Sequence, residues 1–370
     1  MNRFRFDLAT AADDADLRAV LRETPMQGRI AVAFQREPSW FAAAVLDGEQ
    51  RQVIACRDLQ AGRVVGFGCR SLRRLYVDGA PQCLGYLSSL RLLPELRSRG
   101  LVARGYRFFR ELHEDGQTPY YLTTIAEGNM PALRTLVGGR AGLPYYLPAG
   151  RFFTLALPIR RTRLPALPPH VVLRRAVAED LPHIVSFLRE AGPQRQFFPV
   201  VAESDFGARG ERFNGLLASD FHIVERAGEI LGVLGAWDQH ALKQTVVVRY
   251  HGALAWLRPV LNATAALRRQ PLLPQPGESF RFHLAALPVV QNAAREVCDA
   301  LLAYTVRGLC QSASTHLLIG LHERDPLLPV VRRWSVACYT THLYVVGWDA
   351  EVAAKAAAHV RVPYLELGTL

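Results

Sequence analysis

The fold of this chain is decided by the stretch LRLLPELRSRGLVA, residues Leu90–Ala103. A short apolar strand is expected to end at Pro94, and a loop with two arginines and one glycine follows it. A helix is then expected from Val102 onward. The first amides of such a helix have no intrahelical acceptor and lie at the positive end of its dipole, which suits a pyrophosphate. Gly100 removes a Cβ from the path of that ligand toward the backbone.

The segments on both sides of this loop predict further strands and helices. Upstream, apolar and β-branched residues predict strands at 63–70 and 83–92, with a tight hairpin turn between them. Downstream, the run 120–125 has the aromatic and β-branched content of a strand. It leads into a predicted helix at 127–136, with Asn129 at or near the N-cap.

This order of elements resembles the GCN5-related N-acetyltransferases. The coenzyme A loop of that family reads Arg/Gln-x-x-Gly-x-Gly/Ala, and here it reads Arg97-x-x-Gly100-x-Val102, so two of the three anchors agree. In that family the next elements are a strand and then Asn-x-x-Ala at the start of a helix, as occurs here from Asn129. The resemblance covers residues 6–157.

The resemblance implies an α/β fold with a mixed sheet, in which two central parallel strands splay apart to admit the pantetheine arm. It also implies acetyl-CoA as a co-substrate and an amine-bearing acceptor. The residues expected to bind the coenzyme are Leu90, Arg91, Leu92, Arg97, Ser98, Arg99, Gly100, Leu101, Val102, Ala103 and Asn129.

After a proline-rich basic linker the chain repeats its pattern. The strand and acidic helix start that begin at Phe6 have a counterpart that begins at Val172. The loop Pro94-x-x-Arg97-x-x-Gly100 is echoed by Pro288-x-x-Gln291-x-x-Ala294. Self-similarity on this scale predicts tandem copies of one domain. The expected divisions are a first domain at 1–157, a linker at 158–170, a second domain at 171–350 and a C-terminal helix or tail at 351–370.

The two copies are not equivalent in sequence. Ala294 replaces the loop glycine, and Glu296 brings a carboxylate close to the place of the diphosphate; both changes disfavour an anion. The second domain is therefore expected to keep the fold without the coenzyme. The stretch 243–276 departs from the family pattern, with a strand expected at 245–250 and an amphipathic helix at 254–269.

Acetyl transfer from a thioester to an amine needs a base, a donor to the oxyanion and a proton for the thiolate. The family often uses a Glu acting through water as the base, and Glu127 is the candidate here. The backbone of residues 90–92 is the expected oxyanion donor. The family commonly protonates the thiolate with a Tyr seven residues after the Asn of the later helix, where this chain has Leu136. Tyr145 and Tyr146 follow as candidates, with packing on the sheet as their alternative role.

The composition predicts a globular protein with a sizeable core. Of the 370 residues, 50% are hydrophobic and 21% are charged. No apolar run reaches the length of about 18 residues that a spanning helix requires, so no membrane partner is expected. The N-terminus lacks the apolar region of a secretory signal, which predicts a cytoplasmic protein.

The charge and the metal-ligating residue types exclude two further classes. The net charge of +11 comes from basic residues that are arginine except for Lys243 and Lys355. These arginines are not interleaved with aromatic residues as in a single-strand binder, so no nucleic acid is expected. The six cysteines and the histidines lack ligand spacing, so no metal is expected and the cysteines are interpreted as small buried thiols.

Two classes of function stay open. The first is an acetyl-CoA-dependent N-acetyltransferase with one working site in the first domain. The second is a non-catalytic acyl-CoA-binding sensor or scaffold of the same fold, which the missing Tyr favours. The sequence specifies neither the acceptor nor the oligomeric state.

Overall fold

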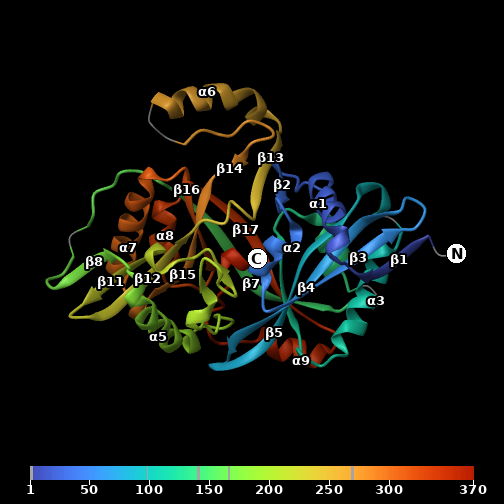
Figure 1. Cartoon of the computed structure of the whole chain (residues 1–370), viewed down its shortest axis with the longest axis horizontal. Coiled ribbons are helices and arrows are strands. Elements are labelled where there is room, and N and C mark those ends of the chain that lie inside the picture. Colours follow the sequence, from blue (N-terminus) through green and yellow to red (C-terminus); the bar gives the residue numbers. More distant parts are fainter. Residues whose placement is uncertain (1–2, 98, 140–141, 166, 268–270) are drawn as a thin grey trace.

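The computed structural model describes residues 3–97, 99–139, 142–165, 167–267 and 271–370 (Figure 1). The strands of the first half are β1 (Phe4–Leu8), β2 (Ile30–Gln35), β3 (Gln50–Asp58), β4 (Arg63–Val77), β5 (Ala80–Leu92), β6 (Tyr121–Ala126) and β7 (Tyr145–Pro158). The helices of this half are α1 (Asp14–Glu23), α2 (Trp40–Ala44), α3 (Leu101–His113) and α4 (Met130–Ala132), which continues as a π-helical turn, Leu133–Val137.

The second half repeats this alternation of strands and helices. Its strands are β8 (Val171–Arg175), β9 (Phe206–Gly207), β10 (Phe213–Asn214), β11 (Phe221–Arg226), β12 (Glu229–Trp237), β13 (Gln244–Tyr250), β14 (Ser279–Phe280), β15 (Phe282–Val290), β16 (His316–His322) and β17 (Ala337–Gly347). Its helices are α5 (Leu181–Ala191), α6 (Ala253–Leu267), α7 (Arg295–Gly308), α8 (Leu328–Trp334) and α9 (Ala350–Ala357).

One mixed sheet joins the two halves. Within the described residues it has twelve strands in the order β1-β3-β4-β5-β6-β17-β7-β16-β15-β12-β11-β8. Five strands of the first half form one end of the sheet, and five strands of the second half form the other end. In chain order β1, β3, β4, β5 and β6 correspond to β8, β11, β12, β15 and β16. The structure therefore confirms two tandem copies of one α/β unit.

The two copies exchange their last strands. β17, which closes the second half, lies between β6 and β7 and pairs antiparallel with both. β7, which closes the first half, pairs antiparallel with β16 of the second half. Each half of the sheet is therefore completed by a strand from the other half.

The strands β4, β5 and β6 have a different cover on each face. On one face Leu87 and Tyr121 pack with Tyr106 and Phe109 of α3. On the other face Tyr86 belongs to a cluster that reaches residues of the second half. The apolar side chains of α3 recur three or four residues apart, which is why this helix buries a single side against the sheet.

Most of the expected elements are confirmed, and Asn129 is the N-cap of α4, with its Oδ1 accepting from the amide of Ala132 at 3.3 Å. The proposed equivalence of Pro94 and Pro288 is wrong. Pro288 lies inside β15, whereas Pro94 follows β5 and opens a short 3₁₀ turn. The helix of the second half begins after a shorter loop, so the two loops align at their N-caps, Gly100 and Ala294, and not at their prolines.

The expectation of buried cysteines is only partly confirmed. All six thiols are free; Cys56, Cys69 and Cys298 are buried, whereas Cys83 and Cys338 are exposed. No helix in the described ranges is long and apolar enough to cross a bilayer.

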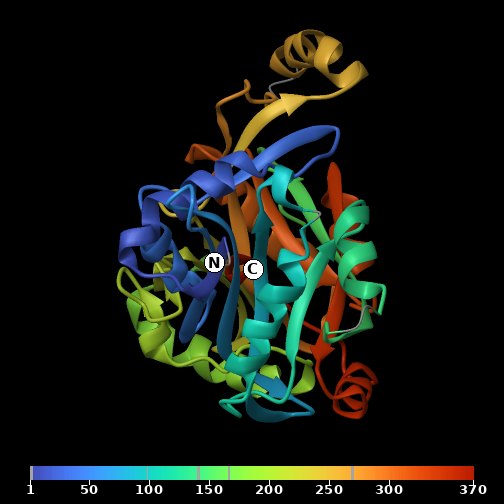
Figure 2. The same cartoon turned by 90° about the vertical axis from the view of Figure 1, so that its right-hand side faces the viewer.

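An arm extends from the second half. It consists of β13, α6 and β14, and β13 pairs antiparallel with β2 of the first half. In both views α6 lies apart from the main body (Figure 1, Figure 2). The strand and the helix of this arm match those expected at 245–250 and 254–269.

A buried histidine makes the second half sensitive to acid. His222 Nδ1 lies 2.9 Å from Thr305 Oγ1, and burial lowers its pKa to about 4. In the unfolded chain the same imidazole binds a proton with a pKa of about 6.5. Protonation therefore favours the unfolded chain, so the fold has its full stability above about pH 6.5 and loses part of it as the pH falls toward 4. We expect the free energy of unfolding to fall by about 2 kcal/mol between pH 7.5 and pH 5 through this group alone. Urea unfolding of His222→Gln at both pH values checks this, because the variant lacks that part of the loss.

Candidate functional site

The N-terminus of α3 is open to a ligand. Among the described residues, the main-chain N–H groups of Leu101, Val102 and Ala103 have no acceptor; the N–H of Arg104 bonds to the carbonyl of Gly100 at 3.3 Å. Gly100 is the N-cap, with φ +67°, and no heavy atom lies within 4 Å of the position that a Cβ would take. This left-handed conformation is costly for any residue with a Cβ, which explains the glycine.

The side chains around these amides add positive charge. Arg97 and Arg99 are exposed in the loop before α3. Ser98, also expected to bind the coenzyme, lies outside the described residues. Arg104 extends the other way, donating from Nη2 to the carbonyl of Phe4 at 2.7 Å. The loop therefore combines free amides with two arginines at one exposed corner.

A gap between β5 and β6 begins near this corner. The two strands pair in parallel only at Gly85–Tyr121 and Tyr86–Leu122. Beyond this pair, Thr123 Oγ1 donates to the carbonyl of Leu87 at 2.7 Å. The register gives residues 88–92 of β5 no partner in β6, so the expected splaying of the parallel strands is present.

A bulge in β5 lies where this gap begins. The pairing with β4 jumps from Cys69–Ser88 to Phe67–Arg91, so Ser89 and Leu90 together face one residue of β4. Ser89 has φ +54°, which is uncommon for a residue with a side chain. The bulge leaves main-chain groups of β5 outside the ladder with β4.

A small cavity lies between α3 and the strands β3, β4 and β5. Its lining is apolar apart from Arg91, and it includes Leu90, Leu92, Val102 and Tyr106. The Nε of Arg91 is buried and has no hydrogen-bond partner among the described atoms. Burial lowers the pKa of this guanidinium. An unpaired buried donor in this position favours a ligand that carries an acceptor.

The two candidate tyrosines have different environments. Tyr146 is buried, its hydroxyl hydrogen-bonds to that of Tyr106, and burial together with Tyr106 raises its pKa well above the usual value. Tyr145 is 52% exposed and lies at the start of β7. Leu136, at the family's Tyr position, is buried in the core beneath α3. Since Tyr106 lines the cavity, Tyr146 is the candidate that lies closer to it.

Glu127 and Asn129 lie at the far side of the gap, after β6. Glu127 is exposed, and its Oε1 is 3.9 Å from Nε2 of His342 in β17. Asn129 is exposed and its amide oxygen is used in capping α4. The expected residues of β5 and of the loop before α3 therefore lie close together. Glu127, the expected base, lies at the solvent edge.

The equivalent position of the second half is filled by the chain itself. β15 carries the same bulge as β5, and its Leu287 has φ +50°. The amide of Leu287 donates to Oε2 of Glu366 at 2.9 Å, and Oε1 of Glu366 accepts from the amide of Gly368 at 3.1 Å. The C-terminal segment therefore occupies the position that stays open in the first half.

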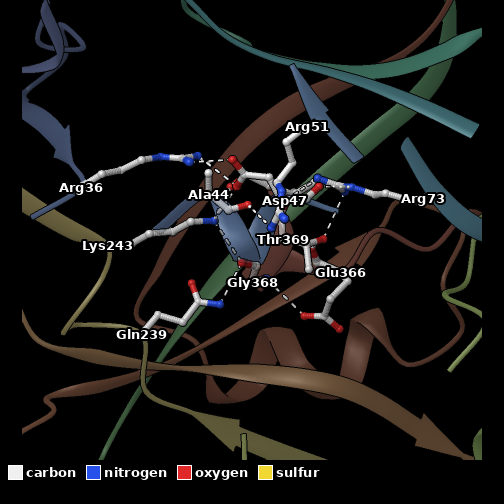
Figure 3. A network of polar contacts seen from close by, with 11 residues as sticks. Arg36, Ala44, Asp47, Arg51, Arg73, Gln239, Lys243, Glu366, Gly368 and Thr369 are labelled. Atoms are coloured by element: carbon white, nitrogen blue, oxygen red, sulfur yellow. Dashed lines mark hydrogen bonds and ion pairs between the residues drawn. The ribbon is translucent and has the colours of Figure 1, made fainter. Parts of the chain in front are cut away.

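A network of buried charges surrounds this segment (Figure 3). Asp47 accepts two hydrogen bonds from Arg36, at 2.6 and 3.0 Å, and lies 3.3 Å from Nζ of Lys243. Burial opposes the ionisation of Asp47, but Arg36 and Lys243 outweigh it and hold the pKa of the carboxyl below its usual value. Burial lowers the pKa of Lys243 to about 8.

Arg73 extends the network toward the C-terminal segment. Its Nε donates to the carbonyl of Asp47 at 2.7 Å, and its two terminal nitrogens bond to Thr369. Arg73, Glu366 and Thr369 border a second cavity, on the face of β4 to β6 that is opposite α3. Two cavities therefore lie on opposite faces of the strands that splay.

Sequence reasoning missed three parts of this site. Neither Tyr106 nor Glu366 is given a role by the sequence analysis. The bulge at Ser89 has no local signal beyond two adjacent serines in a strand. A count of polar residues inside predicted core elements would have singled out Tyr106 and Arg91.

The fold as a whole is similar to that of proteins that transfer acyl groups to amines. Saccharomyces cerevisiae N-myristoyltransferase with bound myristoyl-CoA superposes with a TM-score of 0.61 at 13% identity, over 94% of this chain and 79% of that one. A GCN5-related N-acetyltransferase from Sphaerobacter thermophilus gives 0.55 at 13% identity, over 100% and 99% of the two chains. A GCN5-related N-acetyltransferase from Anabaena variabilis gives 0.51 at 11% identity, over 92% and 72%.

At the level of sequence, no protein-family model and no curated protein matches the chain. The similarity is therefore one of structure, and it extends over nearly the whole chain. It agrees with the mixed α/β fold described above. The chain has the fold of the GCN5-related N-acetyltransferases, in two tandem copies, of which the second has its central position filled.

Proposed function

We propose that this chain is an acyl-CoA-dependent N-acyltransferase that transfers an acetyl group to an amine. The observation that carries the proposal is the start of α3, where the amides of Leu101, Val102 and Ala103 have no acceptor among the described residues, next to the gap between β5 and β6. A diphosphate needs donors and positive charge, and this helix start with Arg97 and Arg99 supplies both.

The rest of coenzyme A fits the same surface. Its pantetheine arm has two amide groups, and residues 88–92 of β5 form a strand edge without a partner in β6. An amide chain can lie along such an edge as an added strand would. The thioester would then lie near the bulge at Ser89, where main-chain groups are outside the ladder.

The reaction proposed near the bulge at Ser89 is transfer of the acyl group from the thioester to the amine. The amine attacks the thioester carbonyl, the C–N bond forms and the C–S bond breaks. The amine loses a proton to a base, for which Glu127 stays the candidate, and the thiolate gains one. We assign the acceptor to the cavity bordered by Arg73 and Glu366, because it lies on the opposite face of the same strands.

Acetyl-CoA binding and turnover test this proposal. Titration calorimetry should detect one site per chain, and release of free thiol should require a primary amine. Acetyl-CoA, octanoyl-CoA and myristoyl-CoA compared at equal concentration define the acyl group. Absence of binding to any of them at near-millimolar concentration would remove the basis of the proposal.

A non-catalytic acyl-CoA sensor is the second candidate. The observation that favours it is Leu136, buried where the family commonly has the Tyr that protonates the thiolate. Binding without thiol release, over a broad panel of amines, would select this function.

Tyr146→Phe separates a catalytic from a packing role for the buried hydroxyl pair. If Tyr146 supplies the proton to the thiolate, kcat should fall by about 100-fold with little change in the KM for acetyl-CoA. Tyr145→Phe is the matched control, because this exposed neighbour should retain full activity. An unchanged kcat with a lower melting temperature in Tyr146→Phe would assign the pair to packing alone.

A further inference from the structure

The helix α6 turns its apolar side chains to solvent. Trp256 is 86% exposed, Val260 60% and Leu267 87%. Residues separated by four and seven positions lie on one side of a helix, so these three form a continuous apolar strip. No residue of α6 is buried, and the helix lies apart from the body in both views (Figure 1, Figure 2).

Two polar residues of α6, Arg258 and Asn262, face the chain segment that returns from this helix. Nη1 of Arg258 donates to the carbonyls of Leu273 and Pro274, both at 3.2 Å. Asn262 donates to the carbonyl of Leu273 at 3.0 Å and accepts from its amide at 2.8 Å. A surface helix normally shows the reverse arrangement, with apolar residues inside and polar residues outside. These polar groups attach α6 to residues 273–274 of the arm. The apolar strip therefore stays on the outer side of the helix, where it can contact a molecule outside this chain.

The charge of the arm is mainly positive. Residues 244–280 contain four arginines, Arg249, Arg258, Arg268 and Arg269, and one carboxylate, Glu278, just before β14. Arg249 is exposed in β13 and Arg29 is exposed just before β2, where the amide of His251 donates to the carbonyl of Arg29 at 2.9 Å. Neither arginine forms an ion pair with the described carboxylates. An anionic partner complements this surface.

We propose that this arm docks on the surface of an anionic lipid bilayer. The strip of Trp256, Val260 and Leu267 would enter the boundary between headgroups and acyl chains, where Trp is favoured. The exposed Arg29 and Arg249 would pair with lipid phosphates. Lipid is favoured over a protein partner because an apolar strip on a projecting helix, in an arm with four arginines and one carboxylate, matches a flat anionic surface. This inference does not depend on the proposed acyl transfer.

Vesicle sedimentation tests the proposal with the full-length chain. Wild-type protein should sediment with vesicles of equal phosphatidylcholine and phosphatidylglycerol, and much less with phosphatidylcholine alone. The triple variant W256S/V260S/L267S should lower the partition coefficient at least about 100-fold, since three apolar side chains no longer leave water. The double variant R29Q/R249Q should lower it about 25-fold, at about fivefold for each arginine near the surface.

A matched control separates the arm from exposed apolar surface in general. Val336 and Val360 are 65% and 90% exposed and lie outside the arm, so V336S/V360S should bind vesicles as the wild type does. The tryptophan emission of the wild type should shift to shorter wavelength on the mixed vesicles, and this shift should be reduced in V260S/L267S, which keeps Trp256. The circular dichroism of each variant shows that the fold is retained.

Three results would overturn the proposal. The first is the absence of sedimentation with either vesicle, and the second is equal binding to both compositions. The third is wild-type self-association that the triple variant abolishes, measured by sedimentation velocity without lipid. That last result would assign the strip to a second copy of this chain.

Discussion

Gly100→Glu should abolish coenzyme A binding while leaving the fold intact. The new carboxylate would lie beside the first amides of α3, which have no acceptor among the described residues, and within about 4 Å of a bound phosphate. Repulsion between two unit charges at that distance is about 4 kcal/mol near a protein surface, so the dissociation constant should rise by more than about 100-fold. Titration calorimetry with acetyl-CoA measures this change.

Gly116→Glu is the matched control for this substitution. Gly116 follows the other end of the same helix, has the same φ of +67°, and likewise has no heavy atom within 4 Å of its Cβ position. Both variants therefore carry the same backbone strain, and only the first adds charge at the proposed diphosphate site. Equal affinities in the two variants would show that the coenzyme does not bind at the start of α3.

Asp47→Asn should cause the largest loss of stability of any single charge removal in the described chain. The change leaves Arg36 and Lys243 buried beside a neutral amide (Figure 3). Removing one partner of a buried ion pair typically costs about 3–5 kcal/mol, because the remaining charge stays out of water. Equilibrium unfolding in urea at pH 7.5 measures this cost.

An exposed ion pair provides the comparison for Asp47. Glu23 lies 3.3 Å from Arg63, and both side chains are more than two-fifths exposed, at 45% and 42%. Glu23→Gln should cost at most about 1 kcal/mol. If Asp47→Asn cost no more than Glu23→Gln, the central network would contribute little to the fold, and its role would have to be sought in binding.

The loop at Gly100 could be predicted because its signals are local. A glycine before a helix, a proline after a strand and an Asn at a cap each act within a few residues. The same holds for the hairpin of β4 and β5 and for the helix of the arm. The repeat of this pattern after the linker was enough to predict two copies of the fold.

The parts of the site that could not be predicted depend on contacts between distant residues. The Tyr106–Tyr146 pair joins residues 40 positions apart, and the bond from Leu287 to Glu366 spans 79 positions. Nothing near Arg91 indicates that its Nε is buried without a partner, because that depends on how α3 and β17 pack around β5. The false equivalence of Pro94 and Pro288 has the same origin, since the spacing of the seven-residue motif matched while the strand lengths differed.

The expected divisions at 157 and 171 stay predictions, and the exchange of β7 and β17 bears on how they should be tested. A fragment that stopped after the linker would lack β17, so the edge of β6 would be unpaired and prone to aggregate. The pairing of β6 with β17 joins residues more than 200 positions apart, and such contacts form late in folding. The duplicated units therefore constitute one cooperative folding unit: neither is expected to persist alone, and separately expressed halves should regain solubility only when mixed.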